Sequence, residues 1–145
     1  MKLIIKEMSI DQYDQILALW QASNGVGLSE ADSRAGIAGF LERNPGFSFV
    51  AFDGEELVGV VLCGHDGRRG YIHHLAVSHS HRRQGIGRAL VVQCLAALER
   101  AGIGKCHIFV FRENKAALAF WQSAGWVDRV DLTMLSQYTQ ASENE

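Results

Sequence analysis

The sequence predicts an α/β fold in which a mixed β-sheet carries helices on both faces. Short apolar runs typical of strands alternate with longer stretches of helical periodicity. Asp53-Gly54 separates two of the apolar runs, which is a hairpin signal and indicates antiparallel neighbours. A glycine-containing segment around Gly85 joins a strand to a long apolar helix, as in strand–helix–strand units.

The N-terminal part predicts one strand and two helices. Leu3–Glu7 reads as a strand, and 11–22 carries apolar residues at helical spacing until 24–27 breaks the helix. Ser29-Glu30-Ala31-Asp32 resembles a capping box that opens a second helix, which Pro45-Gly46 ends.

The rest of the chain predicts five further strands and two further helices. The expected order of the whole chain is β-α-α-β-β-β-α-β-α-β, with the last helix closed by Gly125. The strands are expected at 47–52, 56–63, 71–77, 105–111 and 127–135, and the helices at 85–101 and around 117–124.

Length and composition predict one domain over residues 1–145, with a short polar tail at 140–145. The net charge of −2 provides no basic field for a nucleic acid, so no nucleic-acid partner is expected. No apolar run is long enough for a signal peptide or a membrane span, so we expect a soluble protein without a membrane partner.

The cysteines and histidines indicate the cellular compartment and whether a metal site is present. Cys63, Cys94 and Cys106 are odd in number and lie in apolar runs, which favours free thiols in a reducing, cytoplasmic setting. No His-Glu-x-x-His or Cys-x-x-Cys spacing is present, so no metal site is expected.

Positive charge gathers at the start of the long helix, in Arg82-Arg83-Gln84-Gly85-Ile86-Gly87-Arg88. Glycines allow a tight turn and the close approach of a bulky ligand, and the first helical amides point at an anion ahead of them. Arginines at a helix N-terminus oppose the helix dipole unless an anion is bound. A pyrophosphate therefore explains this cluster better than a solvated helix start.

Two common phosphate motifs fail on the same segment. A P-loop requires a glycine, four residues and then Gly-Lys-Ser/Thr, which is absent. A Rossmann fingerprint requires a third glycine where this chain has Leu90.

The segment resembles instead the Arg/Gln-x-x-Gly-x-Gly/Ala signature of the GNAT superfamily of N-acetyltransferases. It is met by Arg82, Gly85 and Gly87, just after the apolar triplet Leu75-Ala76-Val77. A second stretch, from Asn114 through Trp121 to Gly125-Trp126, is similar to a second motif of that family. The resemblance implies the family's fold, a central mixed sheet with splayed fourth and fifth strands flanked by about four helices.

The resemblance further implies acetyl transfer from acetyl-CoA to a primary amine, by direct attack in a ternary complex. The acceptor would be a small-molecule or peptide amine, and because relatives are often dimers, a homodimer stays open. The amides from Gln84 to Arg88 would hold the coenzyme A diphosphate, and the backbone of Leu75 and Val77 would pair with the pantetheine arm. The implied coenzyme-binding residues are Leu75, Ala76, Val77, Arg82, Arg83, Gln84, Gly85, Ile86, Gly87, Arg88, Asn114, Ala117, Phe120 and Trp121. The acceptor pocket would be shaped by Trp20, Gly25, Val26 and Leu28.

Trp121 departs from the family pattern, which commonly has a tyrosine that protonates the departing thiolate. An indole N–H cannot act as that acid. Either the acid is dispensable or supplied elsewhere, since a thiol of pKa near ~8.5 leaves tolerably as its anion, or the protein is a coenzyme A sensor without turnover. We favour the enzyme.

Tyr71, His73 and His74 on the predicted fourth strand are the candidates for catalysis. A neutral histidine could take a proton from an ammonium substrate. Because side chains alternate along a strand, Tyr71 and His73 should face one side and His74 the other. At least one of the two histidines is therefore expected to be structural.

Overall fold

The computed structural model describes residues 1–140, so the predicted tail lies outside the described residues apart from its first position. The chain divides into two compact units, residues 1–114 and the residues from 115 onward. The first unit holds a five-stranded sheet of order β1-β2-β3-β4-β5, antiparallel except for the parallel β4–β5 pair, which confirms the mixed sheet. Its strands are β1 (Leu3–Glu7), β2 (Phe49–Asp53), β3 (Glu56–His65), β4 (Gly70–Val77) and β5 (Cys106–Ile108).

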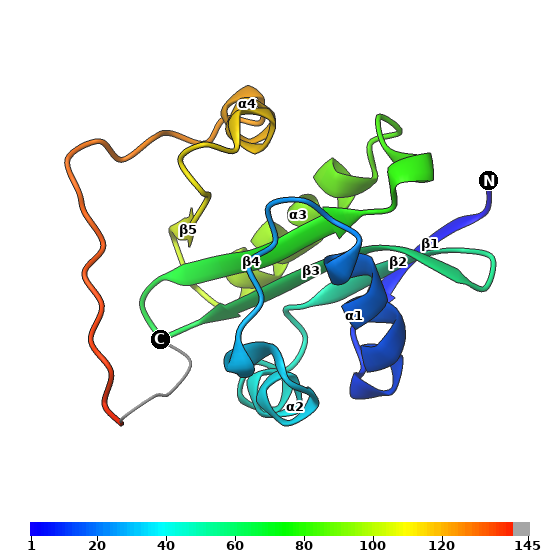
Figure 1. Ribbon diagram of the computed structural model, residues 1–145, viewed down its shortest axis with the longest axis horizontal. Helices are drawn as coiled ribbons and strands as arrows, with labels where there is room; N and C mark the ends of the chain where they lie inside the picture. Colours follow the sequence, from blue (N-terminus) through cyan, green and yellow to red (C-terminus); the bar gives the residue numbers. More distant parts are fainter. Residues whose placement is uncertain (141–145) are drawn as a thin grey trace. The chain divides into compact units, whose positions relative to one another are not determined.

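Helices cover both faces of this sheet, as predicted. Figure 1 shows α1 and α2 in front of the sheet and α3 behind it. Central strand β3 is buried without a break from Leu57 to Gly64, because both of its faces are covered. The helices of this unit are α1 (Tyr13–Gln21), α2 (Arg34–Arg43) and α3 (Ile86–Arg100), with short 3-10 turns η1 (Ile10–Gln12), η2 (Glu30–Asp32) and η3 (His79–His81).

The two faces have separate cores. On the α1/α2 face, Trp20 and Ile37 pack with Val60 and Leu62 of β3. On the α3 face, the helix approaches so closely that a Cβ at Gly59 would lie 3.0 Å from the Leu90 side chain, a tight contact. These packing partners identify the direction in which each β3 side chain points.

The predicted second helix is split in two. Ser29 does form a capping box with Asp32, but the box opens the 3-10 turn η2 rather than α2. The α-helix begins at Arg34 behind a second cap, Ser33, whose hydroxyl accepts from the Gly36 amide. Two caps in succession explain the error, because a capping box signals a helical turn without fixing its length.

Two predicted strands are also corrected. The fifth strand is shorter than 105–111, since its pairing with β4 ends at Ile72 and Ile108. The predicted strand at 127–135 is absent from the described residues, and its side chains are largely exposed, as at Val130 and Leu135. Alternation of apolar residues does not by itself make a strand, because a strand also requires a neighbouring strand with which its backbone forms hydrogen bonds.

The second unit contains α4 (Lys115–Ser123), followed by Gly125 in the left-handed conformation at φ +95°. This is the predicted glycine stop, since only glycine adopts that φ without strain. Trp121 packs edge-on against Phe120 and Trp126, with ring centroids 5.1 and 5.0 Å apart. Among residues 1–140, no helix is both long and apolar enough to cross a membrane.

Candidate functional site

The loop before α3 has a backbone shaped for an anion. Arg83 and Gly85 adopt left-handed conformations, at φ +65° and +82°. A left-handed φ is unusual for an arginine and marks a conformation that the surrounding structure imposes. Gly85 is the N-cap of α3 and, having no side chain, makes no side-chain cap hydrogen bond. Its first turn therefore fits a diphosphate, which would accept hydrogen bonds from these amides.

The predicted coenzyme residues of this loop could serve a ligand only through their backbones or through charge. The Ile86 side chain is buried and Gly87 has none, so both can offer only amides. The side chains of Arg83 and Gln84 are exposed, and Arg88 lies in the first turn of the helix.

Two contacts attach the loop to the sheet. The Arg82 Nε donates to the Val77 carbonyl oxygen at 3.2 Å, which ties the loop to the end of β4. The His81 Nε2 lies 3.0 Å from Asp53 Oδ2 at the β2–β3 turn. This hydrogen bond from His81, with one from the Lys2 amide, lowers the pKa of Asp53. The loop is thus anchored at the end of β4 and at the β2–β3 turn.

The edge of β4 is open where the resemblance placed the pantetheine arm. The β4–β5 ladder stops at Ile72, whereas β4 continues to Val77. This is the predicted divergence of the fourth and fifth strands. β4 pairs with β3 along one edge. Beyond Ile72, its other edge has no strand partner among the described residues. Ala76 is buried against Trp20 and Val60, so it can serve a ligand only through its backbone.

A bulge in β4 overturns the prediction that the two histidines face opposite sides. Leu62 pairs with His73 and Val60 pairs with Ala76, so the register shifts by one residue between these pairs. Leu62 and Val60 both face α1 and α2, and His73 and Ala76 therefore do so as well. Strict alternation would have put residues three apart on opposite faces.

The extra residue of the bulge is accommodated at His74, whose φ is +53°. Its ring lies edge-on to Trp20 of α1, with centroids 5.1 Å apart, and 6.4 Å from the ring of His73. His73 packs edge-on against Phe40 of α2 at 6.1 Å. Both imidazoles consequently line the same side of the sheet.

The environments of the three catalytic candidates differ. Burial, followed by the charge of neighbouring His74, lowers the pKa of His73 and favours its neutral form. His74 has its Nε2 2.9 Å from the Asp32 Oδ1. Tyr71 stacks on Phe109, with ring centroids 6.2 Å apart and planes within 9°. The structure therefore brings the two histidines together and places Tyr71 toward β5.

Asp32 was missed by the sequence reasoning as a site residue. It was identified only as the last member of a capping box, a role that it does fill through Oδ2. Nothing in the local pattern reveals that its other oxygen reaches a residue 42 positions away. A buried carboxylate beside a histidine becomes visible only once the tertiary structure is known.

The α1–α2 connection lies beside the end of the first unit. The side-chain amide of Asn114 is so close to Gly25 that a Cβ there would require the Asn114 side chain to move, and Gly27 lies against the ring of Phe111. Asn114 and Gly25, which the resemblance assigned to the coenzyme and to the acceptor pocket, are thus neighbours. Ala117, Phe120 and Trp121 belong to α4 and are described within the second unit.

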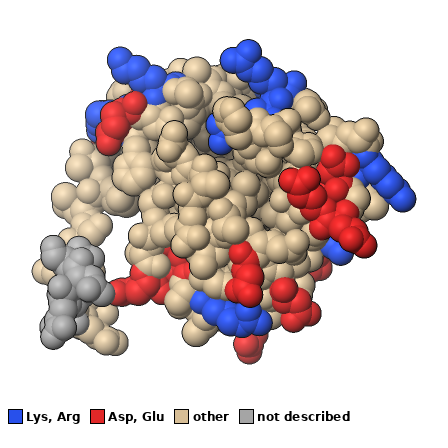
Figure 2. All heavy atoms as spheres, turned by 45° about the vertical axis from the view of Figure 1, so that its right-hand side comes forward, with Lys and Arg blue, Asp and Glu red and all other residues tan. Residues whose placement is uncertain are grey.

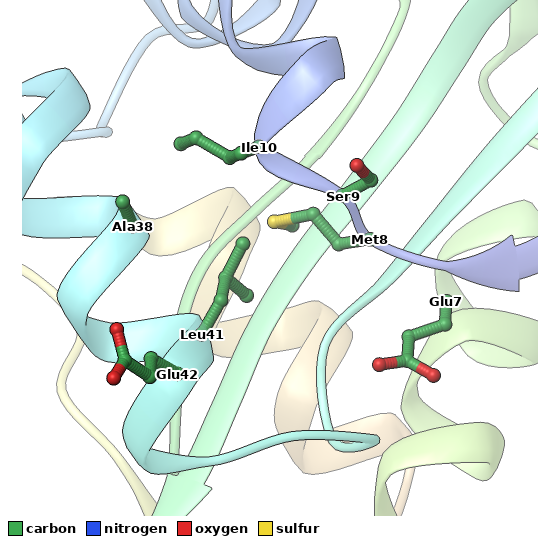
Figure 3. Close-up of a pocket in the computed structure, with 7 residues that line it drawn as sticks. All are labelled: Glu7, Met8, Ser9, Ile10, Ala38, Leu41 and Glu42. Atoms are coloured by element: carbon green, nitrogen blue, oxygen red, sulfur yellow. The ribbon is translucent and has the colours of Figure 1, made fainter.

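A separate open depression of about 530 Å³ lies at the opposite edge of the sheet (Figure 3). Met8 and Leu41 form its apolar floor, and Glu7 and Glu42 flank it. β1 is three strands away from β4, so this depression is no part of the site above.

Charged side chains of both signs share the surface that Figure 2 draws, and no metal-binding cluster is present among the described residues. Figure 2 shows Lys and Arg interspersed with Asp and Glu on the face that it draws, rather than one basic field. Within residues 1–140, no group of His, Cys, Asp and Glu side chains is arranged to hold a metal ion.

Comparison with known proteins identifies the family. The sequence profile described as the Acetyltransferase (GNAT) family matches residues 13–126. The chain belongs to this family. N-alpha-acetyltransferase 30 of Schizosaccharomyces pombe is 33% identical over 104 residues, which are 68% of this chain and 69% of that protein. The Xenopus laevis protein of the same name is 36% identical over 93 residues, 61% of this chain, and the match spans only 34% of its length.

Solved structures show the same fold. Ard1 from Thermoplasma volcanium superimposes with a TM-score of 0.77 at 21% identity, covering 88% of this chain and 84% of that one. A chain of the NatC complex bound to Gag peptide and CoA gives a TM-score of 0.73 at 25% identity, covering 88% and 86%. The prediction of a GNAT acetyltransferase with acetyl-CoA as cosubstrate is confirmed at the level of the family. Nothing in these comparisons supports the alternative of a sensor without turnover.

Proposed function

We propose that this GNAT protein acetylates the N-terminal α-amine of a peptide, with acetyl-CoA as the donor and direct attack in a ternary complex. The observation that carries the proposal is the arrangement within 73–88. In the first unit, two adjacent imidazoles, an open strand edge and a helix that starts at a glycine N-cap follow one another. The choice of a peptide amine rests on the 33% identity to a protein named N-alpha-acetyltransferase 30.

The residues of the loop and of β4 would bind the donor. Amides from Gln84 to Arg88 would hold its diphosphate, with positive charge from Arg82, Arg83 and Arg88. The backbone of Leu75 and Val77 would pair with the pantetheine arm at the open edge of β4. When bound, acetyl-CoA supplies a thioester carbonyl and a thiolate leaving group.

The remaining candidates would have subsidiary roles. Asn114, beside Gly25, would close the site from the side of the α1–α2 connection. Ala117, Phe120 and Trp121 would contribute as the second family motif. Trp121 offers no acid, so the thiolate would leave as an anion, which its ordinary pKa of about 8.5 permits. The proton acceptor would be one of the imidazoles, His73 or His74.

The organisation and setting of the protein are proposed as follows. One acetyltransferase domain would extend over residues 1–145, since the family match crosses the boundary between the two units. The protein would act in the cytoplasm, where the free thiols of Cys63, Cys94 and Cys106 would remain reduced. Homodimerisation remains a proposal from the resemblance.

Calorimetric titration of acetyl-CoA followed by measurement of thiol release tests the function. The amine panel contains a peptide with a free N-terminus, the same peptide N-terminally blocked with a free lysine, a polyamine and an aminoglycoside. We expect binding of acetyl-CoA and acceptor-dependent thiol release with the free N-terminus alone. Release with the polyamine or aminoglycoside alone would refute the peptide acceptor, and binding without release from any amine would refute the enzyme.

A further inference from the structure

Asp32 is held in one orientation by three hydrogen bonds from different elements. Its Oδ2 accepts from the Ser29 amide at 3.0 Å, and its backbone carbonyl accepts from the Tyr13 hydroxyl at 2.7 Å. Its Oδ1 lies 2.9 Å from the Nε2 of His74. The carboxylate is nearly buried, with 11% of its side chain exposed. Such a carboxylate has little freedom to turn away from the imidazole.

His74 is held just as firmly from the other side. The Trp20 indole N–H donates to the His74 carbonyl oxygen at 3.0 Å, so the bulge diverts this carbonyl toward α1. The Trp20 ring also packs against the imidazole. A left-handed φ at a histidine costs energy, and backbone strain of this kind persists where surrounding contacts over-determine it. Trp20, Asp32 and the bulge together determine where this ring points.

The hydrogen bond to Asp32 also determines the tautomer of His74. An ionised carboxylate only accepts, so Nε2 must carry the proton, and the lone pair then resides on Nδ1. The His74 side chain keeps 20% of its surface exposed, and Nδ1 has no hydrogen-bond partner among residues 1–140. The ring thus presents a proton acceptor beside the stretch of β4 that lacks a partner strand.

We propose that Asp32 is a positioning residue that holds His74 as the proton acceptor for the attacking amine. This inference rests on the proposed acetyl transfer and selects between its two imidazoles. Asp32 touches no substrate and acts through His74, as the buried aspartate of a catalytic triad acts through its histidine. His73 instead packs against Phe40 of α2, next to the His74 ring.

The proton and electron balance of the step is complete. An acceptor R–NH3⁺ gives one proton to Nδ1, and the freed lone pair forms the C–N bond to the thioester carbonyl carbon. The C–S bond then breaks, and its electron pair leaves with the coenzyme A thiolate. The second proton lost by the nitrogen neutralises that thiolate through solvent, and His74 returns its own proton to water.

The charged and titratable groups around His74 are few. Asp32 faces it from η2, and His73 faces it from the preceding position of β4. α1 contributes the uncharged Trp20 ring. Among residues 1–140, Asp32 is the carboxylate that contacts the His74 ring.

Steady-state kinetics of the variants, with the best amine of the panel, test the proposal. We expect His74→Asn to lower kcat on the order of 10²-fold, with the KM for acetyl-CoA unchanged within about twofold. Asp32→Asn should lower kcat similarly, because its amide would donate to Nε2 and move the proton to Nδ1. The double variant should be no worse than His74→Asn alone.

Ser29→Ala is the matched control. It removes the other half of the capping box, the Ser29 hydroxyl that accepts from the Ala31 amide, and leaves the contact between Asp32 and His74 in place. Activity should remain at the wild-type value. An equal loss in Ser29→Ala and Asp32→Asn would show that Asp32 matters only for the turn. Additive losses in the double variant, or a loss in His73→Asn with none in His74→Asn, would also overturn the proposal.

A second measurement separates failure of this inference from failure of the proposed function. Long-range ¹H–¹⁵N NMR reports which imidazole nitrogen carries the proton, without any acceptor present. The expected result is the Nε2–H tautomer of His74 in the wild type and the Nδ1–H tautomer in Asp32→Asn. The same tautomer in both proteins would overturn the positioning role, even for an active enzyme. The expected switch in a protein that acetylates no amine would instead refute the proposed function.

Discussion

The two glycines that flank α3 provide a matched test of the diphosphate site. Gly85 precedes the helix at φ +82° and Gly102 follows it at φ +80°. At either position an added Cβ would meet no atom within 4 Å. Alanine therefore brings the same penalty at both ends, the strain of a left-handed L-residue, which is about 1–2 kcal/mol. Any difference between the two variants must come from what the glycine does besides turning the chain.

The expected difference lies in donor affinity. Relaxation of φ at residue 85 would rotate the first amides of α3 away from the diphosphate. The loss of one hydrogen bond to a charged group costs about 1.5–3 kcal/mol, which raises Kd roughly 10- to 100-fold. Gly102 lies beyond the far end of a helix of 15 residues, a length of about 22 Å. Gly102→Ala should leave the Kd unchanged.

Calorimetric titration of acetyl-CoA and thermal denaturation measure the two effects separately. Both variants should lose about 3–6 °C in Tm, the shift that the common strain produces in a chain of this size. Only Gly85→Ala should lose affinity. If Gly85→Ala binds acetyl-CoA as tightly as the wild type while its Tm falls, the amides of this helix start do not hold the diphosphate. Equal losses of affinity in both variants would show that destabilisation of α3 as a whole, and not the loss of amide contacts at its start, weakens binding.

Three further predictions concern stability. Gly70→Val should lower the free energy of unfolding, measured by urea denaturation, by about 1–3 kcal/mol through overpacking, because a Cβ at residue 70 would lie 2.6 Å from Leu98; an unchanged free energy of unfolding would show that Leu98 moves aside. The hydrogen bond from His81 lowers the pKa of Asp53, so the ionised carboxylate stabilises the fold at pH values above its ordinary pKa. This stabilisation is lost progressively as the pH falls from about 5 to 3. In acid unfolding followed by circular dichroism, Asp53→Asn should therefore show a smaller loss of stability than the wild type over this pH range. Identical acid transitions in the two proteins would contradict this prediction. Burial lowers the pKa of His73, so the unfolded chain takes up that proton first and stability drops as the pH falls below about 6.5. His73→Asn should flatten the dependence of Tm on pH between about 7 and 5, and an unaltered slope would show that another group titrates there.

Much of the sheet and the turn before α3 could be predicted because the signals are local. The hairpin at Asp53-Gly54 and the break before Ile86 depend on residues that are adjacent in sequence. The same holds for the left-handed glycine that follows α4. A turn conformation is decided by a few neighbouring dihedral angles, so single residues can reveal it.

The predictions that failed depended on partners distant in sequence. Whether 127–135 forms a strand depends on a neighbouring strand, which apolar alternation cannot supply. Where β5 ends depends on how far β4 stays parallel to it. The capping box at Ser29 was identified correctly, but the length of the helical turn behind it was not.

By itself, the sequence determined the mixed α/β fold, the glycine turn at the start of α3 and the family, because each of these depends on periodicity or on contiguous residues. Only the tertiary structure decided the acceptor side of the site. The register of β4 on β3 inserts one residue at His74, and that insertion turns both imidazoles toward α1 and α2. Asp32 then meets His74 across 42 positions of sequence. A bulge results from competition between two strands and the helix packed on them, and no single strand contains the information that settles it.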